Sequence, residues 1–494
     1  MTSPDIIVIG TGMGGATLTH ALADSGARIL VLDKGAQLPD RPENRDTRAI
    51  FQRGFFRPNE TWYDHQGAPF NPGNYYVHGG NSKFYGGVLI RYRERDFEDL
   101  EHADGLSPAW PIRYGDLAPY YDRAEALYQV RGALGEDPTE PPHGGPYPFS
   151  PVPDEPPIAA TRARLKKQGL HPFSLPLGVD ITRWLAHGKT PWDAYPDART
   201  GKMDAETCAL LPALKHENVT LVSNAEVERL ILSPDRRRIE AVEYVEGGER
   251  KRVSARLVVL AAGAVRSAVI LLASDAANRS DMVGRHFMNH NASAMLAVDP
   301  FLKNDSVYQK TFGLNDFYFS DGRGGPPLGN VQLLGKVSAP ILKANAPAVP
   351  EFVHGLIARH AVDFYLMSED LPDPRSRVML DGRRIVLAWQ RSNMTAHEGL
   401  VKRMRAVLRA AGFPIVLSRL FDRRTPSHQC GTVRMGNDPA TSVVDPFGRS
   451  HDHANLFVVD AGTLVTSAAV NPSLTVAAIA LRAADHIKRT ELAA

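Results

Sequence analysis

The chain has 494 residues, of which 57 are lysine or arginine and 55 are aspartate or glutamate, so its net charge is only +2. Hydrophobic residues make up 43% and charged residues 23%, a composition that excludes disordered, collagen-like and disulfide-rich proteins. The near-neutral charge argues against nucleic acid as a partner. At roughly 150 residues per domain, the length predicts about three domains or one large enzyme.

Sequence features also bear on location and metal binding. No apolar run approaches the roughly 20 residues of a membrane span, and the N-terminus lacks the cationic and apolar segments of a signal peptide. The two cysteines, Cys208 and Cys430, lie outside any CxxC spacing, which favours a reducing compartment and argues against a structural metal site. We therefore expect a soluble cytoplasmic protein with no membrane partner and no bound metal.

The first 35 residues predict a strand, a tight turn, a helix and a second strand. Residues 6–9 and 29–32 are continuous apolar runs, typical of parallel strands buried on both faces. Gly10, Gly12 and Gly15 follow the first run. In such a pattern the first glycine makes the turn, the second lets the backbone approach a pyrophosphate, and the third lets the helix pack on the strand.

Asp33 ends the second strand. A carboxylate at this place accepts hydrogen bonds from the adenosine ribose hydroxyls and repels a 2′-phosphate. The pattern therefore predicts a dinucleotide site, against the alternative of a glycine-rich turn without a ligand. At this point FAD and NAD both remain open.

The middle of the chain contains a proline-rich arm at about residues 131–160. Nine prolines fall within residues 138–157, and because proline lacks a backbone donor and fixes its own φ, this segment cannot be a helix or a central strand. We expect an ordered arm, which could form an oligomer interface, and then a short helix over residues 158–169. Three short strands are predicted within residues 219–245, and a buried strand at residues 257–260 precedes a helix.

Residues 291–426 have a different character. Alternating patterns predict antiparallel strands at residues 316–319, 331–334, 362–365 and 385–389. An amphipathic helix is predicted over residues 397–411. After residue 455 the α/β character returns, with a strand at residues 456–460 and a final helix that starts at Pro472.

Several motifs share the order and spacing of one known family. They are GGNSKFYG at residues 79–86, WPIRYGDLAPY at 110–120, LAAGAVRS at 260–267, VGRHFMNH at 283–290, HQCGTVRMG at 428–436, SVVD at 442–445, NLFVVD at 455–460 and NPSLT at 471–475. This set resembles the glucose–methanol–choline (GMC) family of FAD-dependent alcohol oxidoreductases. FGLNDFY at residues 312–318 and the NSKFY segment are most similar to the bacterial pyranose oxidase and glycoside 3-oxidase branch.

The resemblance implies an α/β fold, α+β overall, with two domains. A discontinuous Rossmann-type FAD-binding domain would comprise residues 1–290 and 427–494. A substrate domain built on an antiparallel β-sheet with helices would comprise residues 291–426.

The resemblance also implies a catalytic pair, His428 and Asn471. In this family a base removes the hydroxyl proton of a carbinol while the carbon-bound hydride goes to the flavin, and a neutral histidine suits the role of base. Asn471 would orient the substrate and stabilise the developing alkoxide. The Asn-Pro sequence also predicts that Asn471 is the N-cap of a helix, with Pro472 at its first position. The acidic pair Glu369 and Asp370 is predicted to be a solvated turn.

The predicted FAD site is non-covalent. Members with covalent flavin have a histidine at the position of Phe84, and phenylalanine cannot make that bond. The residues expected to hold FAD are Gly10, Gly12, Met13, Gly14, Gly15, Asp33, Lys34, Gly80, Asn81, Ser82, Phe84, Tyr85, Gly86, Val227, Ala262, Gly263, Asp460, Ala461, Pro472 and Thr475.

The leading functional hypothesis is oxidation of a secondary hydroxyl of a sugar or glycoside to a ketone, with oxygen or a quinone as the electron acceptor. Asn330 and Gln332 are candidates for recognition of substrate hydroxyls, and Tyr318, Tyr365 and Trp389 for stacking on a sugar, although core packing is the simpler role for these aromatics. The alternatives are a choline- or aliphatic-alcohol-oxidising enzyme of the same family, or a lyase that contains FAD without redox chemistry.

Overall fold

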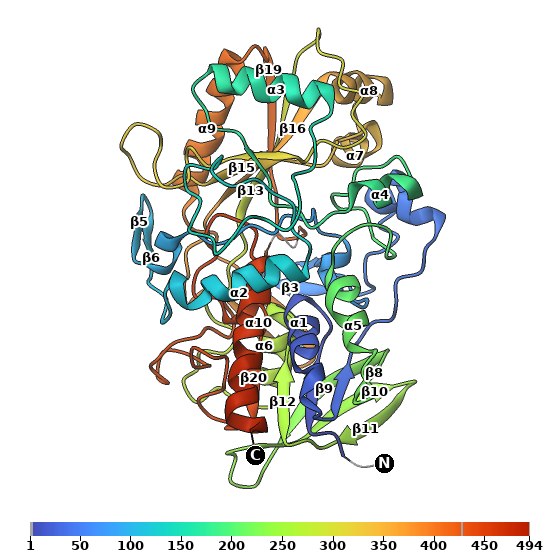
Figure 1. The fold of residues 1–494 in the computed structure, drawn as a ribbon, viewed down its shortest axis with the longest axis vertical. Helices are drawn as coiled ribbons and strands as arrows, with labels where there is room; N and C mark the ends of the chain where they lie inside the picture. Colours follow the sequence, from blue (N-terminus) through green and yellow to red (C-terminus); the bar gives the residue numbers. More distant parts are fainter. Residues whose placement is uncertain (1–2, 426–427, 494) are drawn as a thin grey trace.

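The computed structural model describes residues 3–425 and 428–493. Its helices are α1 (Met13–Leu22), α2 (Tyr114–Leu127), α3 (Pro156–Lys167), α4 (Ile181–His187), α5 (Leu211–Ala213), α6 (Ala264–Ala273), α7 (Ala339–Asn345), α8 (Glu351–His360), α9 (Met394–Ala410) and α10 (Ser473–Ile487). In Figure 1 both ends of the chain lie at the bottom, next to the parallel sheet, while α7, α8 and α9 lie at the opposite end of the molecule.

A parallel sheet forms the lower part of the molecule in Figure 1. Its order is β20 (Leu456–Val458), β12 (Leu257–Leu260), β1 (Ile6–Ile9), β2 (Ile29–Leu32) and β8 (Val219–Val222). All neighbours pair in parallel, and every residue of β1 and β12 is buried, because helices cover both faces. The predicted Rossmann-type strand–helix–strand unit is therefore confirmed.

A small antiparallel sheet follows β8 in the chain. It consists of β9 (Ala225–Leu232), β10 (Ile239–Glu246) and β11 (Glu249–Val253). The three short strands predicted within residues 219–245 are therefore β8, β9 and β10, although β8 belongs to the parallel sheet. The turns of the meander fall at the Ser-Pro-Asp and Glu-Gly-Gly sequences.

The second large sheet has six strands and is antiparallel throughout. Its order is β19 (Ile415–Leu420), β13 (Asn291–Val298), β16 (Ala361–Ser368), β15 (Asn330–Leu333), β14 (Phe312–Leu314) and β7 (Phe173–Ser174). Leu400, Met404 and Leu408 of α9 pack on one face of this sheet, which confirms the amphipathic helix and shows that it starts three residues earlier than predicted. The mixed α/β fold class is thus confirmed.

One of the four strands predicted in this region was wrong, and another belongs to a different sheet. Residues 316–319 form a turn, and the strand there is β14, because the buried run that pairs with β15 ends at Leu314. Residues 385–389 do form a strand, β18 (Arg384–Ala388), but it belongs to a separate sheet. That sheet also contains β17 (Arg377–Asp381), β3 (Trp62–Asp64) and β4 (Pro69–Phe70), and a hairpin of β5 (Leu100–His102) and β6 (Gly105–Ser107) stands apart.

The proline-rich arm is ordered against the rest of the chain. Arg131 pairs with Phe149 and with Leu177, and Glu155 accepts hydrogen bonds from the backbone N–H groups of Val307 and Tyr308. Helix α3 starts at Pro156 rather than at residue 158, since two prolines fit the first turn, where backbone N–H groups have no helical partner.

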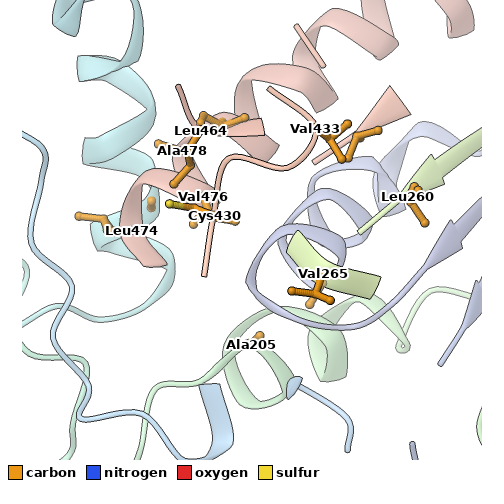
Figure 2. Packing of buried hydrophobic residues seen from close by; sticks show 14 of the residues in the cluster. Ala205, Leu260, Val265, Cys430, Val433, Leu464, Leu474, Val476 and Ala478 are labelled. Carbon is orange, nitrogen blue, oxygen red and sulfur yellow. The ribbon is translucent and has the colours of Figure 1, made fainter. Parts of the chain in front are cut away.

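Helix α10 packs against α1 and α2, and its N-terminal end reaches the site described below. Figure 2 shows its Leu474, Val476 and Ala478 among the buried side chains of the large core, together with Cys430. Both Cys208 and Cys430 are buried and unpaired. Among the described residues, no helix combines the length and the apolar character needed to cross a membrane.

Candidate functional site

A cavity of about 1020 Å³ opens between the parallel sheet and the six-stranded sheet. Gly12 and Asp33 line it from the first βαβ unit, and Ala294 and Tyr365 line it from strands β13 and β16. His428 and Asn471 both border the same cavity. The structure therefore brings the predicted dinucleotide turn and the predicted catalytic pair to one place.

The glycine turn has the local geometry that a dinucleotide requires. Gly10 has φ +101°, and a Cβ atom there would lie 2.5 Å from the carbonyl oxygen of Ala261. A Cβ at Gly15 would lie 2.0 Å from the carbonyl oxygen of Gly10, so helix and strand pack closely at this residue. Nothing lies within 4 Å of a Cβ placed at Gly12, which leaves room for a pyrophosphate against the backbone. The turn therefore fits a dinucleotide such as FAD.

Asp33 is buried and already makes several protein contacts. One carboxylate oxygen accepts from the backbone N–H and the hydroxyl of Thr11, at 2.8 and 2.5 Å, and the other accepts from the Gly35 N–H at 2.7 Å. Burial raises the pKa of Asp33, while the hydrogen bonds from Thr11 oppose that shift. Because a carboxylate has about four acceptor positions, one remains for a ribose hydroxyl.

All but two of the residues predicted to hold FAD border the cavity. Those that border it are Gly10, Gly12, Met13, Gly14, Asp33, Lys34, Gly80, Asn81, Ser82, Phe84, Tyr85, Gly86, Val227, Ala262, Gly263, Asp460, Ala461 and Pro472. The two exceptions are Gly15, which packs against Gly10, and Thr475, whose hydroxyl lies 2.8 Å from that of Tyr121.

Phe84 forms part of the cavity wall. Its ring stacks on that of Tyr75, with 3.6 Å between ring centroids and 10° between planes. The neighbouring His78 is buried outside the lining, where its Nε2 atom lies 2.9 Å from the Ser223 hydroxyl.

His428 and Asn471 meet at the cavity. The Nδ2 atom of Asn471 lies 3.2 Å from the Nε2 atom of His428. Asn471 was predicted to cap the last helix, but α10 begins at Ser473 with Pro472 as its N-cap residue. The Asn471 side chain instead bonds to His428 and accepts from Gln332 Nε2 at 3.0 Å.

A second histidine contacts the ring nitrogen of His428 that does not face Asn471. His290, the residue before β13, is buried, and its Nδ1 atom lies 2.8 Å from the Nδ1 atom of His428. Burial lowers the pKa of His428 well below its usual value, and His290 and Lys310 shift it in the same direction. His428 and Ala468 both adopt left-handed backbone, with φ +71° and +51°, a conformation that non-glycine residues adopt rarely and that concentrates at functional sites.

Asn330 and Gln332 do not border the cavity. The Nε2 group of Gln332 donates to the side-chain oxygens of Asn330, at 3.1 Å, and of Asn471. Asn330 donates in turn to Asn315 Oδ1 at 2.7 Å, and Asn315 to Asp137 Oδ2 at 2.7 Å. Direct recognition of substrate hydroxyls by these two residues stays a prediction, and the contact that the structure shows is with Asn471.

Sequence reasoning missed a buried ion pair at the cavity. Lys310 Nζ lies 2.7 Å from Asp193 Oδ2, and the ammonium lies 5.6 Å from the centre of the Tyr365 ring. All three residues line the cavity. Lys310 lies two residues before the stretch 312–318 that carried the subfamily resemblance, but no local pattern connects it with Asp193, more than a hundred residues earlier.

The acidic pair at residues 369 and 370 is not a solvated turn, so that prediction was wrong. Both side chains are buried. Glu369 accepts from the Ser107 hydroxyl at 2.5 Å, and Asp370 from Trp389 Nε1 at 2.8 Å. Burial raises the pKa of Asp370 to about 6. The pair follows β16, and its polar partners come from other sheets, with Ser107 in β6 and Trp389 directly after β18.

Of the three aromatics considered for stacking, only Tyr365 borders the cavity. The Trp389 indole is bonded to Asp370, and the Tyr318 hydroxyl donates to Asp96 Oδ2 at 2.9 Å. These two rings therefore pack in the hydrophobic core.

Among the described residues, Asp122, Glu125 and His143 form a cluster of metal-ligand type. The guanidinium of Arg91 already bonds both carboxylates, at 2.6 Å each. The arrangement is therefore an ion network around the buried side chain of Arg91.

Comparison with known proteins adds independent findings. Residues 186–292 and 372–480 match the GMC oxidoreductase family, and residues 8–47 match the NAD(P)-binding Rossmann-like domain. The chain is 28% identical to 6'''-hydroxyparomomycin C oxidase of Streptomyces lividus, over 98% of this chain and 91% of that protein. It is 32% identical to C-glycoside 3-oxidase of Microbacterium trichothecenolyticum, over 55% of this chain and 54% of that protein.

A solved structure extends the likeness in fold. Pyridoxine 4-oxidase from Mesorbium loti superposes with a TM-score of 0.68 over 99% of this chain and all of that one, at 18% identity. The superposition shows a likeness in fold alone. The segments that match the GMC models show that the chain belongs to the GMC oxidoreductase family, whose members act on the CH–OH groups of alcohols and sugars and whose Rossmann-like domain implies FAD.

Proposed function

We propose that this protein oxidises a secondary hydroxyl of a sugar or glycoside to a ketone, with FAD as its cofactor. The observation that carries the proposal is the contact between His428 Nε2 and Asn471 Nδ2 at the edge of a cavity that the glycine turn also lines. One group there can accept a proton, and the other can donate a hydrogen bond to the same oxygen.

His428 acts as the general base in this proposal. Burial lowers the pKa of His428 well below its usual value, so the ring is neutral at neutral pH and one of its two nitrogens holds a free electron pair. A substrate hydroxyl placed at Nε2 loses its proton to His428. The Nδ2 group of Asn471 stabilises the negative charge that develops on the substrate oxygen.

FAD would be held by the glycine turn at Gly12, by Asp33 at the ribose, and by the segments around residues 80–86, 262–263 and 460–461 that border the cavity. When bound, FAD accepts the hydride that leaves the carbinol carbon. The start of α10, with its unpaired N–H groups and positive dipole, favours negative charge at this part of the cavity.

The ion pair of Lys310 and Asp193 favours a hydroxyl-rich substrate. An ammonium group has three donors, of which Asp193 takes one, and sugar hydroxyls can accept from the others. A quaternary ammonium group, such as that of choline, has no hydrogen-bond acceptor for these donors. The names of two relatives, 6'''-hydroxyparomomycin C oxidase and C-glycoside 3-oxidase, support the same substrate class.

Anaerobic reduction of the flavin tests the proposal. The purified holoenzyme is mixed without oxygen with a panel of sugars, glycosides, choline and aliphatic alcohols, and loss of flavin absorbance is followed. We expect bleaching by members of the sugar or glycoside group, and no rapid bleaching in the His428→Ala variant. Bleaching by choline or simple alcohols alone would refute the substrate class. Product formation without bleaching would indicate the lyase alternative. Peroxide release in air then separates oxygen from a quinone as the acceptor.

We also propose that the FAD is not covalently bound, because Phe84 occupies the position of the linking histidine. Acid precipitation of the protein should leave the yellow colour in the supernatant. Flavin that stays with the pellet would contradict this, and a His78→Ala variant would then show whether His78 forms the bond.

The division into an FAD domain (1–290 and 427–494) and a substrate domain (291–426) is part of the proposal. The parallel sheet draws its strands from the first set, and the six-stranded sheet draws all but β7 from the second. Residues 426 and 427, where the second boundary is proposed, lie outside the described residues. Limited proteolysis with and without FAD tests the division, because FAD should protect cleavage sites in the first set selectively.

A further inference from the structure

We propose that His290 is a positioning residue that holds the ring proton of His428 on Nδ1, so that Nε2 is left as the proton acceptor. This inference rests on the proposed role of His428 as base. It adds a residue that does not reach the substrate but decides which nitrogen of His428 can react.

Two backbone carbonyl groups determine which ring nitrogen of His290 carries the proton. Its Nε2 atom lies 3.0 Å from the carbonyl oxygen of Ser467 and 2.9 Å from that of Ala468. Carbonyl oxygens only accept hydrogen bonds, so Nε2 of His290 must carry a proton. In the neutral ring, Nδ1 of His290 is then an acceptor. The 2.8 Å contact with His428 Nδ1 therefore requires the proton to lie on His428 Nδ1.

A chain of hydrogen-bonded side-chain amides, which ends at Nε2 of His428, requires the same tautomer. Asp137, which is paired with Arg93, accepts from Asn315 Nδ2, and a carboxylate cannot donate. Asn315 must therefore turn its side-chain oxygen toward Asn330. As a result, Asn330 donates to Asn315, and Gln332 donates to Asn330.

At the end of this chain Asn471 accepts from Gln332 with Oδ1 and presents its NH₂ group to His428 Nε2. An NH₂ group is a donor, so Nε2 must be an acceptor. Two hydrogen-bond networks that share no residue except His428 thus require the same tautomer. Neutral His290 also accepts a charge-assisted hydrogen bond from His428 once the substrate proton has made His428 a cation.

Three variants at His290 separate this role from a structural one. His290→Asn keeps an acceptor near the place of Nδ1 but loses the donor to the Ser467 and Ala468 carbonyls. His290→Gln keeps a donor near the place of Nε2 but loses the acceptor, and His290→Ala loses both. We expect the rate of flavin reduction to fall roughly 10–10³-fold in the Gln and Ala variants, against the 10²–10⁴-fold typical of losing a base, and to stay within about tenfold of wild type in the Asn variant.

The opposite order would overturn the proposal. If the Gln variant reacts at the wild-type rate while the Asn variant matches Ala, His290 only anchors the 467–468 backbone. FAD content and the substrate concentration for half-maximal rate should stay near wild type in all folded variants, because His290 does not border the cavity.

A direct measurement needs neither substrate nor variants of His290. Proton–nitrogen correlation spectra of holoenzyme labelled with nitrogen-15 histidine report which ring nitrogen carries the proton, and the His428 signals are identified by their loss in His428→Ala. We expect a protonated Nδ1 and an unprotonated Nε2 at neutral pH. The reverse pattern would overturn the proposal, and because this result is independent of turnover, it stays separate from any failure of the proposed sugar oxidation.

Discussion

The side chains of His428 and Asn471 approach to 3.2 Å although 43 residues separate them in the chain. His428 follows the six-stranded sheet and Asn471 precedes α10, so the two meet only because those elements pack around one cavity. Each also has a partner on its far side, His290 for His428 and Gln332 for Asn471. The pair is therefore held in place before a substrate arrives.

The Asn471→Ala variant should reduce its flavin about 10–10³-fold more slowly than wild type. One hydrogen-bond donor to the developing negative charge is lost in this variant, while the base remains. The double variant His428→Ala, Asn471→Ala should be no slower than the product of the two single effects, because both groups act on one oxygen. Rapid-mixing measurements of flavin reduction are the check. A double variant slower than that product would contradict this, because it would mean that each residue partly compensates for the loss of the other.

The pH dependence of kcat/KM should report His428. Its deprotonated form is the active one, and since burial lowers its pKa well below 6.5, activity should stay flat through the neutral range and decline only as the pH falls through that lowered pKa. Asn471→Asp, which places a carboxylate where the amide faces Nε2, should move this acid limb to higher pH. An acid limb at the same pH in both proteins would mean that another group controls the profile.

Asp33→Ala should weaken FAD binding by about 1–3 kcal/mol, the usual effect of losing a charge-assisted acceptor. The structure adds a second consequence, because Asp33 also accepts hydrogen bonds from Thr11 and Gly35. Asp33→Asn is the matched control, since its oxygen can keep part of these contacts. FAD affinity is measured by recovery of free-flavin fluorescence on dilution. Equal affinity in wild type and the Ala variant would exclude a ribose contact.

His397 on α9 should make the protein less stable in mild acid. Its ring is buried between the hydroxyls of Ser293 and Ser368, and burial lowers its pKa to about 4. Between pH 6.5 and 4 the unfolded chain takes up a proton that the folded protein does not, so the free energy of unfolding falls as the pH falls. His397 alone should contribute on the order of 2 kcal/mol of loss by pH 5.

Urea unfolding at pH 7 and pH 5 measures this effect. His397→Gln keeps polar contacts for the serines but cannot titrate, so its unfolding midpoint should change less between the two pH values than that of wild type. An equal change in both proteins would place the acid sensitivity elsewhere, with His286, whose pKa burial also lowers to about 4, as the next candidate.

Local sequence patterns predicted the parts of the site whose geometry is local. The glycine turn, the buried parallel strands and α10 follow from glycine spacing and apolar runs within short segments, and the structure has them at those positions. The start of α10 differed by one residue because the Asn471 side chain is used by Gln332 and His428 rather than by the helix end.

The sequence by itself determined the strands and helix around the dinucleotide turn, because glycine spacing and apolar runs are local patterns. Its resemblance to a known family predicted that residues 428 and 471 form a pair. Only the tertiary structure decided what surrounds them. Lys310 meets Asp193 at the cavity, and the 369–370 acidic pair lies in the core instead of in water. Packing also places the His290 ring against the Nδ1 atom of His428. The physical reason is that a buried polar group must find its hydrogen-bond partner wherever packing places one, and here that partner comes from distant segments of the chain.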